Sequence, residues 1–267
     1  MSMVSHSAGW THLLRPTAHR DSRVVVFPHA GAGAERYASV LAGLPDSVEV
    51  VGVTLPGRER RASLAPRTTL TAAVSGVRRE LSALAPAPTV FYGHSLGGLL
   101  ALAVAHAGGG RCDGLVVSCS RPGARSLPRP RHPDAAAELA EIFAWHRLPA
   151  DALHDPSLSP ARQVLAHDLA LARHALRAVD SLRLTVPVTA LAGTDDPLVP
   201  LGELPLWARF TSGPFRQRSA QGGHFFPFTP NGQGVLLEEL AASLTAAHAA
   251  DVVRGSARGL PASSPAR

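Results

Sequence analysis

The sequence contains no lysine, so its formal net charge of +6 at pH 7 comes entirely from arginine. The arginines are spread along the chain without an aromatic-interleaved basic stripe, which argues against nucleic-acid binding. No apolar run approaches the roughly 18 residues needed to span a membrane. The N-terminal residues also lack the basic start and apolar core of a signal peptide. We therefore expect a cytoplasmic protein that binds neither a membrane nor nucleic acid.

Cysteine is scarce as well, since Cys112 and Cys119 are the only two. They bracket the apolar stretch Gly114–Ser118, and an extended strand would hold their Cα atoms roughly 20 Å apart, beyond the reach of a disulfide. Their spacing is not that of a metal site. The sequence thus predicts two reduced thiols and no metal.

What is present is a chain of 267 residues with 45% hydrophobic content, enough for one globular domain over residues 1–250. Short β-branched runs alternate with helical patterns, which predicts an α/β fold with a mostly parallel central sheet flanked by helices. The expected strands are Val24–Phe27, Val48–Leu55, Thr89–Tyr92, Gly114–Ser118, Val186–Leu191 and Phe215–Ala220, and the expected helices include Glu35–Leu44, one from about Thr69, and Leu99–Ala107.

The alternation stops over residues 121–184. Residues 121–133 are rich in proline and arginine, and two amphipathic helices follow, at Asp134–His146 and from Ser159–Pro160. An insertion without strands in an α/β pattern predicts a helical lid over the catalytic end of the sheet, the alternative being helices that merely cover it. Residues 251–267 are expected to form a disordered tail.

The most informative stretch is Gly93-His94-Ser95-Leu96-Gly97. It lies between a predicted strand and a predicted helix, which is the placement of a nucleophile elbow, where a strained turn raises a serine Oγ above the sheet. Glycines flank the serine because side chains there would collide with the neighbouring strand and helix. The alternative is a glycine-rich turn with a bystander serine.

A second loop follows the strand Val24–Phe27 and is made of small residues, Pro28 to Gly33. In hydrolases built on the elbow, this loop supplies one oxyanion-hole amide and the residue after the serine supplies the other. We therefore predict the backbone N–H groups of Ala30 and Leu96 as the oxyanion hole. The alternative is that the glycines only turn the chain.

Serine needs a histidine base that a carboxylate orients, in the chain order serine, acid, histidine. The turn Gly193–Pro197 is the one carboxylate-bearing turn after a suitable strand, and Asp196 is favoured over Asp195 because Pro197 pushes it into an extended conformation. His224 follows the last predicted strand and is the expected base. His248, in the apparent final helix, is a weaker candidate.

Five motifs follow one another over about residues 10–245: Phe27-Pro28-His29-Ala30-Gly31, Leu55-Pro56-Gly57-Arg58, Gly93-His94-Ser95-Leu96-Gly97-Gly98, Gly193-Thr194-Asp195-Asp196-Pro197 and Gly222-Gly223-His224-Phe225-Phe226. With these motifs in this order, the sequence resembles the type II thioesterases, the stand-alone α/β-hydrolases of modular polyketide and nonribosomal peptide synthases.

The resemblance implies hydrolysis of acyl groups from the phosphopantetheine arm of acyl or peptidyl carrier domains, to clear stalled or wrong units. It also implies that Ser95, Asp196 and His224 form the triad. No cofactor is expected, because the arm belongs to the substrate, and we expect a monomer. The rival hypotheses are a small-molecule esterase with the same triad and an inactive scaffold that binds a synthase.

Recognition of an acidic carrier domain would use positive charge at the mouth of the site. Arg58, Arg60 and Arg61 follow one strand end, and further arginines, Arg121, Arg125, Arg129 and Arg131, lie where the lid leaves the sheet. We predict a positive rim from these residues, with Arg125, Arg129 and the loop residue His29 as substrate-binding residues. The alternative is ordinary solvated arginines.

Overall fold

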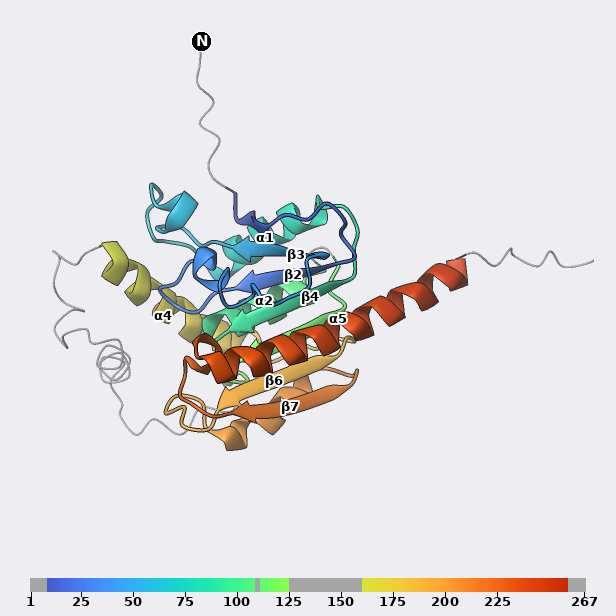
Figure 1. The fold of residues 1–267 in the computed structure, drawn as a ribbon. Coiled ribbons are helices and arrows are strands. Elements are labelled where there is room, and N and C mark those ends of the chain that lie inside the picture. The colour runs from blue at the N-terminus through green and yellow to red at the C-terminus, as the bar shows by residue number, and fades with distance from the viewer. Residues whose placement is uncertain (1–8, 109–110, 125–159, 259–267) are drawn as a thin grey trace, which may run out of the picture.

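The computed structural model describes residues 9–108, 111–124 and 160–258. They form a seven-stranded sheet in the order β1-β3-β2-β4-β5-β6-β7, in which β1 runs antiparallel to β3 and all other neighbours are parallel (Figure 1). The α/β fold class is therefore confirmed, while β1 was not foreseen. The strands are β1 Thr11–Arg15, β2 Ser22–Phe27, β3 Val48–Val53, β4 Thr89–His94, β5 Gly114–Ser118, β6 Val188–Gly193 and β7 Phe215–Ala220.

Helices cover both faces of the sheet, and this explains why the central strands are buried at every position and mostly apolar. Side chains alternate along β2, so that Val25 and Phe27 pack with α1, α2 and α4 while Val24 and Val26 pack with α5 and η1. The helices are α1 Leu70–Ser82, α2 Leu96–His106, α4 Pro160–Ala178 and α5 Pro230–Arg258, with 3₁₀ segments η1 Ala34–Tyr37, η2 Glu59–Arg61, η5 Leu201–Phe210 and η6 Phe226–Phe228.

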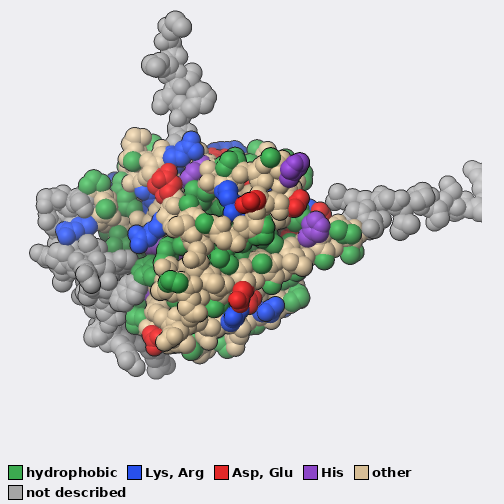
Figure 2. All heavy atoms as spheres, in the orientation of Figure 1, with side chains coloured by type: hydrophobic (Ala, Val, Ile, Leu, Met, Phe, Trp, Pro, Cys, Tyr) green, Lys and Arg blue, Asp and Glu red, His purple; other side chains and the backbone are tan. Residues whose placement is uncertain are grey.

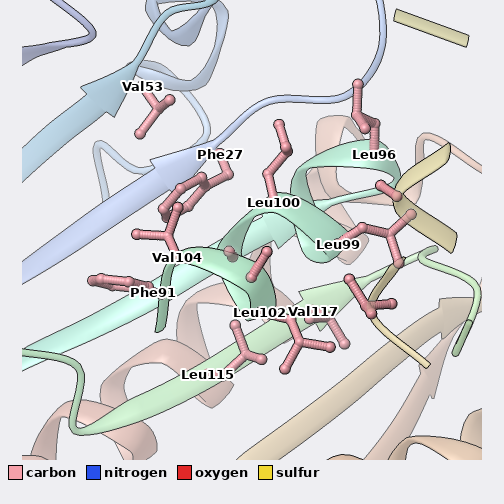
Figure 3. Packing of buried hydrophobic residues seen from close by; sticks show 14 of the residues in the cluster. Phe27, Val53, Phe91, Leu96, Leu99, Leu100, Leu102, Val104, Leu115 and Val117 are labelled. Atoms are coloured by element: carbon pink, nitrogen blue, oxygen red, sulfur yellow. The ribbon is translucent and has the colours of Figure 1, made fainter. Parts of the chain in front are cut away.

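Helix α2 is apolar nearly all round because it lies between the sheet and two other helices. Leu96, Leu99 and Leu100 are buried with Phe27 and Phe91 of the strands beneath them (Figure 3). Contacts with α1 and α4 cover its outer side. The helix that begins directly after Ser95 is thus held on every side, which fixes the position of the serine.

The expected helix Glu35–Leu44 is wrong. The structure has only the 3₁₀ segment η1, followed by turns in which Ala42 and Leu44 donate to carbonyls three residues earlier. Gly43 and Pro45 limit the stretch to a length at which an α-helix is marginal on its own, and short runs of this kind adopt 3₁₀ geometry.

The expected disordered tail from residue 251 is also wrong in its first part, because α5 continues to Arg258. Two ion pairs hold the extended part of the helix. Asp251 lies 2.7 Å from Arg111 and Arg254 lies 2.7 Å from Asp113, and these two partners stand directly before β5 in the chain. Figure 1 shows this end of α5 on the side opposite the strand arrowheads. Residues 259–267 lie outside the described residues.

The lid expectation falls largely outside the described residues, which omit 125–159 and so the predicted helix Asp134–His146. The second predicted helix is confirmed as α4, beginning at Pro160. Its apolar face packs on α2 and, more lightly, on α1, over the helical layer of the sheet. It therefore lies on the same side of the sheet as the elbow helix, next to the strand ends that carry the predicted site.

Positively charged, negatively charged and hydrophobic side chains are interspersed on the surface. On the face in Figure 2, arginine and acidic side chains are interspersed without a continuous basic stripe. The edge strand β7 is mostly exposed, and its Arg216 and Arg218 pair with Glu238 and Glu239 of α5. Among the described residues, no helix is both long enough and apolar enough to cross a membrane.

Candidate active site

Ser95 occupies the turn between β4 and α2 with φ 54° and ψ −120°, a conformation that residues other than glycine rarely adopt. The two flanking glycines are required by close approaches. A Cβ on Gly97 would lie 1.8 Å from the carbonyl oxygen of Phe27, and one on Gly93 would lie 2.3 Å from the carbonyl oxygen of Gly97. The geometry is that of a nucleophile elbow.

Two backbone amides beside Ser95 point to no protein acceptor. In the loop after β2, the neighbours of Ala30 are engaged: His29 N–H donates to the Tyr37 hydroxyl at 3.2 Å and Gly31 N–H to Asp168 at 2.7 Å. Within the described part of the chain, the amides of Ala30 and of Leu96, the first residue of α2, have no acceptor. They are available to an oxyanion.

Asp196 and His224 lie together at the carboxyl ends of β6 and β7. His224 Nδ1 is 2.9 Å from Asp196 Oδ2, and both residues are buried. The other oxygen of Asp196 accepts the amides of Leu198 and Val199 at 2.8 and 3.2 Å. Asp195, in contrast, is exposed and contacts the hydroxyl of Thr194. The carboxylate that faces the histidine is therefore that of Asp196.

The ionisation of Asp196 is set by competing effects. Burial by itself would raise the pKa of this carboxyl, but hydrogen bonds from His224, the Leu198 amide and the Cys119 thiol outweigh it, so the pKa lies below its ordinary value. The group stays ionised in the folded protein at neutral pH. It can thus hold His224 in the tautomer with Nδ1 protonated, in which Nε2 is the ring nitrogen able to accept a proton.

Cys119 is a neighbour of this pair that the sequence reasoning did not assign. It follows β5, is 1% exposed and has a φ of 47°. Burial, followed by the charge of Asp196, raises the pKa of its thiol well above the ordinary value, so the thiol remains protonated and donates to Asp196. Its position at the end of the strand next to β6 was the available signal.

Two further histidines pack beside the site. His94 is fully buried with Nδ1 2.7 Å from Ser118 Oγ, and its pKa lies well below the ordinary value because of burial first and then the neighbouring His224 and His29. His29 Nδ1 is 2.6 Å from the Tyr37 hydroxyl, and its ring is buried. The substrate-binding role of His29 stays a prediction, and the contacts shown are internal ones.

The arginine rim is corrected in part. Arg58 and Arg61 are 8% and 6% exposed, so they are structural and cannot meet a partner, whereas Arg60 is exposed. Arg121 lies 3.1 Å from Glu203, which offsets its charge. The predicted substrate-binding residues Arg125 and Arg129, with Arg131, lie outside the described residues.

The structure also shows the state of the two cysteines and two groups of side chains that could bind a metal. Cys112 and Cys119 are free thiols, as expected. Ligand-capable atoms of Cys119, Asp196 and His224 lie within 4.8 Å of one another, as do those of a separate group formed by His12, Glu35 and Glu59. In the first group these atoms already hydrogen-bond to each other, so the arrangement suits proton transfer as it stands.

Residues 22–244 match the model of the thioesterase domain family. The chain belongs to the thioesterase family. This thioesterase is 35% identical over 227 residues to thioesterase PikA5 of Streptomyces venezuelae, which covers 81% of this chain and 79% of PikA5. It is 31% identical over 230 residues to a probable cadicidin biosynthesis thioesterase of Streptomyces griseus, covering 82% of this chain but only 62% of that relative.

Solved structures agree with this assignment. The type II thioesterase BorB from the borrelidin biosynthetic cluster is 27% identical, with a TM-score of 0.71, over 90% of this thioesterase and 99% of BorB. The family identifies the chain as a hydrolase that acts on thioesters, built on the α/β-hydrolase fold. The elbow, the free amides and the Asp196–His224 pair are the parts of this fold that such chemistry requires.

Proposed function

We propose that this thioesterase hydrolyses acyl groups from the phosphopantetheine arm of carrier domains, with Ser95, His224 and Asp196 as its catalytic triad. The observation that carries the proposal is the buried Asp196–His224 pair on the strand ends beside the Ser95 elbow. The substrate class is supported by two relatives named for biosynthesis, the probable cadicidin biosynthesis thioesterase and BorB from the borrelidin biosynthetic cluster. Removal of aberrant acyl units is the role that this combination fits best.

In the first half of the reaction, Ser95 Oγ attacks the thioester carbonyl while His224 Nε2 accepts its proton. The carbonyl oxygen becomes an oxyanion, and the amides of Ala30 and Leu96 donate to it. When the intermediate collapses, the carbon–sulfur bond breaks and His224 returns the proton to the pantetheine sulfur. The products are the free thiol of the carrier arm and an ester on Ser95.

In the second half, a water molecule takes the place of the thiol. His224 Nε2 accepts one of its protons as the oxygen attacks the ester, and the same amides hold the second oxyanion. Collapse releases the carboxylic acid, and the proton on His224 returns to Ser95 Oγ. Asp196 remains ionised throughout and stabilises the imidazolium formed in each half.

We further propose the oligomeric state, the compartment and the partners of the enzyme. The enzyme would act as a monomer in the cytoplasm, on arms carried by acyl or peptidyl carrier domains. The predicted contribution of Arg125 and Arg129 is to attract the acidic surface of the carrier, which raises the encounter rate more than the affinity. Arg58 and Arg61 are excluded from this role by their burial.

The decisive experiment compares one acyl group presented on a whole carrier domain, on a short pantetheine thioester and on the matching oxygen ester. We expect the highest kcat/KM for the carrier, and no measurable turnover by Ser95→Ala or His224→Ala although both variants fold. Equal or faster cleavage of the free oxygen ester would assign the protein to the esterases. Failure of the wild type to react with a fluorophosphonate would favour a scaffold without activity.

A further inference from the structure

A buried carboxylate on α4 is bonded to the oxyanion loop. Asp168 is 0% exposed, and its Oδ2 accepts the N–H of Gly31 at 2.7 Å across 137 positions of sequence. Arg58 donates to both carboxylate oxygens, at 2.5 and 2.8 Å. A buried carboxylate is stable only when it is paired and hydrogen-bonded, and here both conditions are met by residues of two separate loops.

The loop that donates Gly31 N–H to Asp168 is fixed by contacts on both sides of Ala30. Gly31 has a φ of 81°, and the side chain of Leu165, also on α4, lies against it. Ala32 N–H donates to the carbonyl of His29 at 3.1 Å, and His29 N–H donates to Tyr37. These contacts fix the orientation of the Ala30 amide, which has no acceptor within the described residues.

The charge of Asp168 would oppose catalysis if it were unbalanced, because it lies one peptide unit from an amide that must stabilise an oxyanion. The two N–H donors of Arg58 neutralise it locally. Arg58 also donates to the carbonyl of Ala32 at 3.0 Å, so the guanidinium closes a connection between the loop, α4 and the segment after β3. The pair thus supplies an acceptor for Gly31 N–H without a net negative charge.

We propose that Asp168 is a positioning residue for the oxyanion hole: it holds the Ala30–Gly31 peptide through Gly31 N–H, and Arg58 cancels its charge. The inference rests on the proposed function of Ala30, and it gives α4 a role in catalysis beyond covering the sheet. It also predicts that the seating of α4 and the competence of the oxyanion hole are coupled through one carboxylate.

The test uses Asp168→Asn and, as a matched control, Glu49→Gln. Glu49 forms a buried pair with Arg23 at 2.5 Å, at the amino ends of β2 and β3 and so at the end of the strands opposite Ser95. Thermal unfolding first establishes a temperature at which all variants are folded. At that temperature kcat and KM are measured for one acyl-pantetheine thioester, together with the affinity for a trifluoromethyl ketone analogue that forms an oxyanion on Ser95.

We expect Asp168→Asn to lower kcat by about 10- to 100-fold, less than the 10²–10³-fold typical of losing an oxyanion donor outright. The one remaining side-chain oxygen can still accept from Gly31 N–H, but the new NH₂ group faces the guanidinium of Arg58 and displaces the side chain. The Ala30 amide is then misaligned but present. Affinity for the trifluoromethyl ketone should fall by a similar factor, with KM changed by less than about 3-fold. Glu49→Gln should lower the Tm yet keep kcat within about 2-fold of wild type.

A second variant covers the case in which Asp168→Asn does not fold. Replacing the pair with apolar side chains, Arg58→Met with Asp168→Leu, removes the buried charges together, which is often neutral for stability. It removes the acceptor of Gly31 N–H outright, so kcat should fall at least as far as in Asp168→Asn. Wild-type kcat in this double variant would overturn the inference, as would equal kcat losses in Asp168→Asn and Glu49→Gln.

Failure of this inference is distinct from failure of the proposed function. If the proposed function is wrong, the wild type does not turn over the pantetheine thioester or Ser95→Ala still does. If only the inference is wrong, the wild type is active and depends on Ser95, while the Asp168 variants keep both kcat and the affinity for the trifluoromethyl ketone.

Discussion

Exchanging the carboxylate of Asp196 for an amide should disable the enzyme through the tautomer of His224. In the structure, Asp196 Oδ1 accepts two backbone amides, from Leu198 and Val199, while Oδ2 faces His224 Nδ1. In Asp196→Asn, the amide oxygen must stay with the two backbone donors, which turns the NH₂ group toward His224. The imidazole must then accept at Nδ1 and carry its proton on Nε2, where it cannot take the proton of Ser95.

The magnitude follows from the loss of this proton acceptor. A triad with the wrong histidine tautomer loses about 10⁴ in kcat, or about 5 kcal/mol of transition-state stabilisation at 1.36 kcal/mol per factor of ten. Asp195→Asn is the matched control, because that side chain is exposed and its carboxylate hydrogen-bonds only to Thr194 among the described residues. Its kcat should stay within about 2-fold of wild type.

The assay is steady-state hydrolysis of an acyl-pantetheine thioester, followed by release of the free thiol, with circular dichroism to show that both variants are folded. The reasoning is refuted if Asp195→Asn loses more activity than Asp196→Asn, which would move the acid to Asp195. Similar large losses in both variants would show that the turn, and not the tautomer, is what the substitutions disturb.

Three other predictions concern a buried histidine, a glycine of the elbow and two arginines of the predicted rim. Burial lowers the pKa of His94, so the folded state resists protonation of this ring, and its contribution to stability is present above about pH 6.5 and is lost as pH falls. Below that pH, the free energy of unfolding measured in urea should fall with decreasing pH by up to about 1.4 kcal/mol per pH unit more in wild type than in His94→Gln. Gly97→Ala should abolish folding or activity, since its Cβ would lie 1.8 Å from a backbone oxygen, whereas Gly202→Ala, with nothing within 4 Å, should keep wild-type kcat and Tm. Charge reversal of Arg125 and Arg129 to glutamate should lower kcat/KM for a carrier-bound acyl group and remove its salt dependence, while hydrolysis of a pantetheine mimic stays unchanged; equal effects on both substrates would refute a role in carrier recognition.

The parts of the site that could be predicted are those written in local sequence. The elbow was accessible because Gly93 and Gly97 flank Ser95 between a β-branched run and a Leu/Ala-rich run, and the structure shows the close backbone approaches that require both glycines. The choice of Asp196 over Asp195 depended on Pro197 alone, a neighbour in sequence. Local rules of this kind depend on steric constraints within a few residues, and distant parts of the chain did not alter them.

What could not be predicted depends on contacts between distant residues. Nothing near Asp168 indicates that its carboxylate meets Gly31, and nothing near Arg58 indicates that it is buried against Asp168. The placement of Arg58 and Arg61 on the rim was wrong for the same reason: charge is visible in the sequence, whereas the exposure of these two side chains is decided by what packs over them. The hydrogen bond from Cys119 to Asp196 joins two strands that are neighbours only in the folded sheet.

The direction of α5 determines on which side of the sheet a linker, tag or solid support joined to the carboxyl end of this helix would lie. The helix begins at Pro230, just after the η6 turn beside His224, and ends at Arg258, near the amino ends of the strands, where Arg254 is tied to Asp113. A linker, tag or solid support joined to that end of the helix would approach from the side opposite Ser95. Surface immobilisation through this end of the helix should therefore leave the strand ends that carry Ser95 and His224 facing the solution, where the proposed carrier domain can reach them.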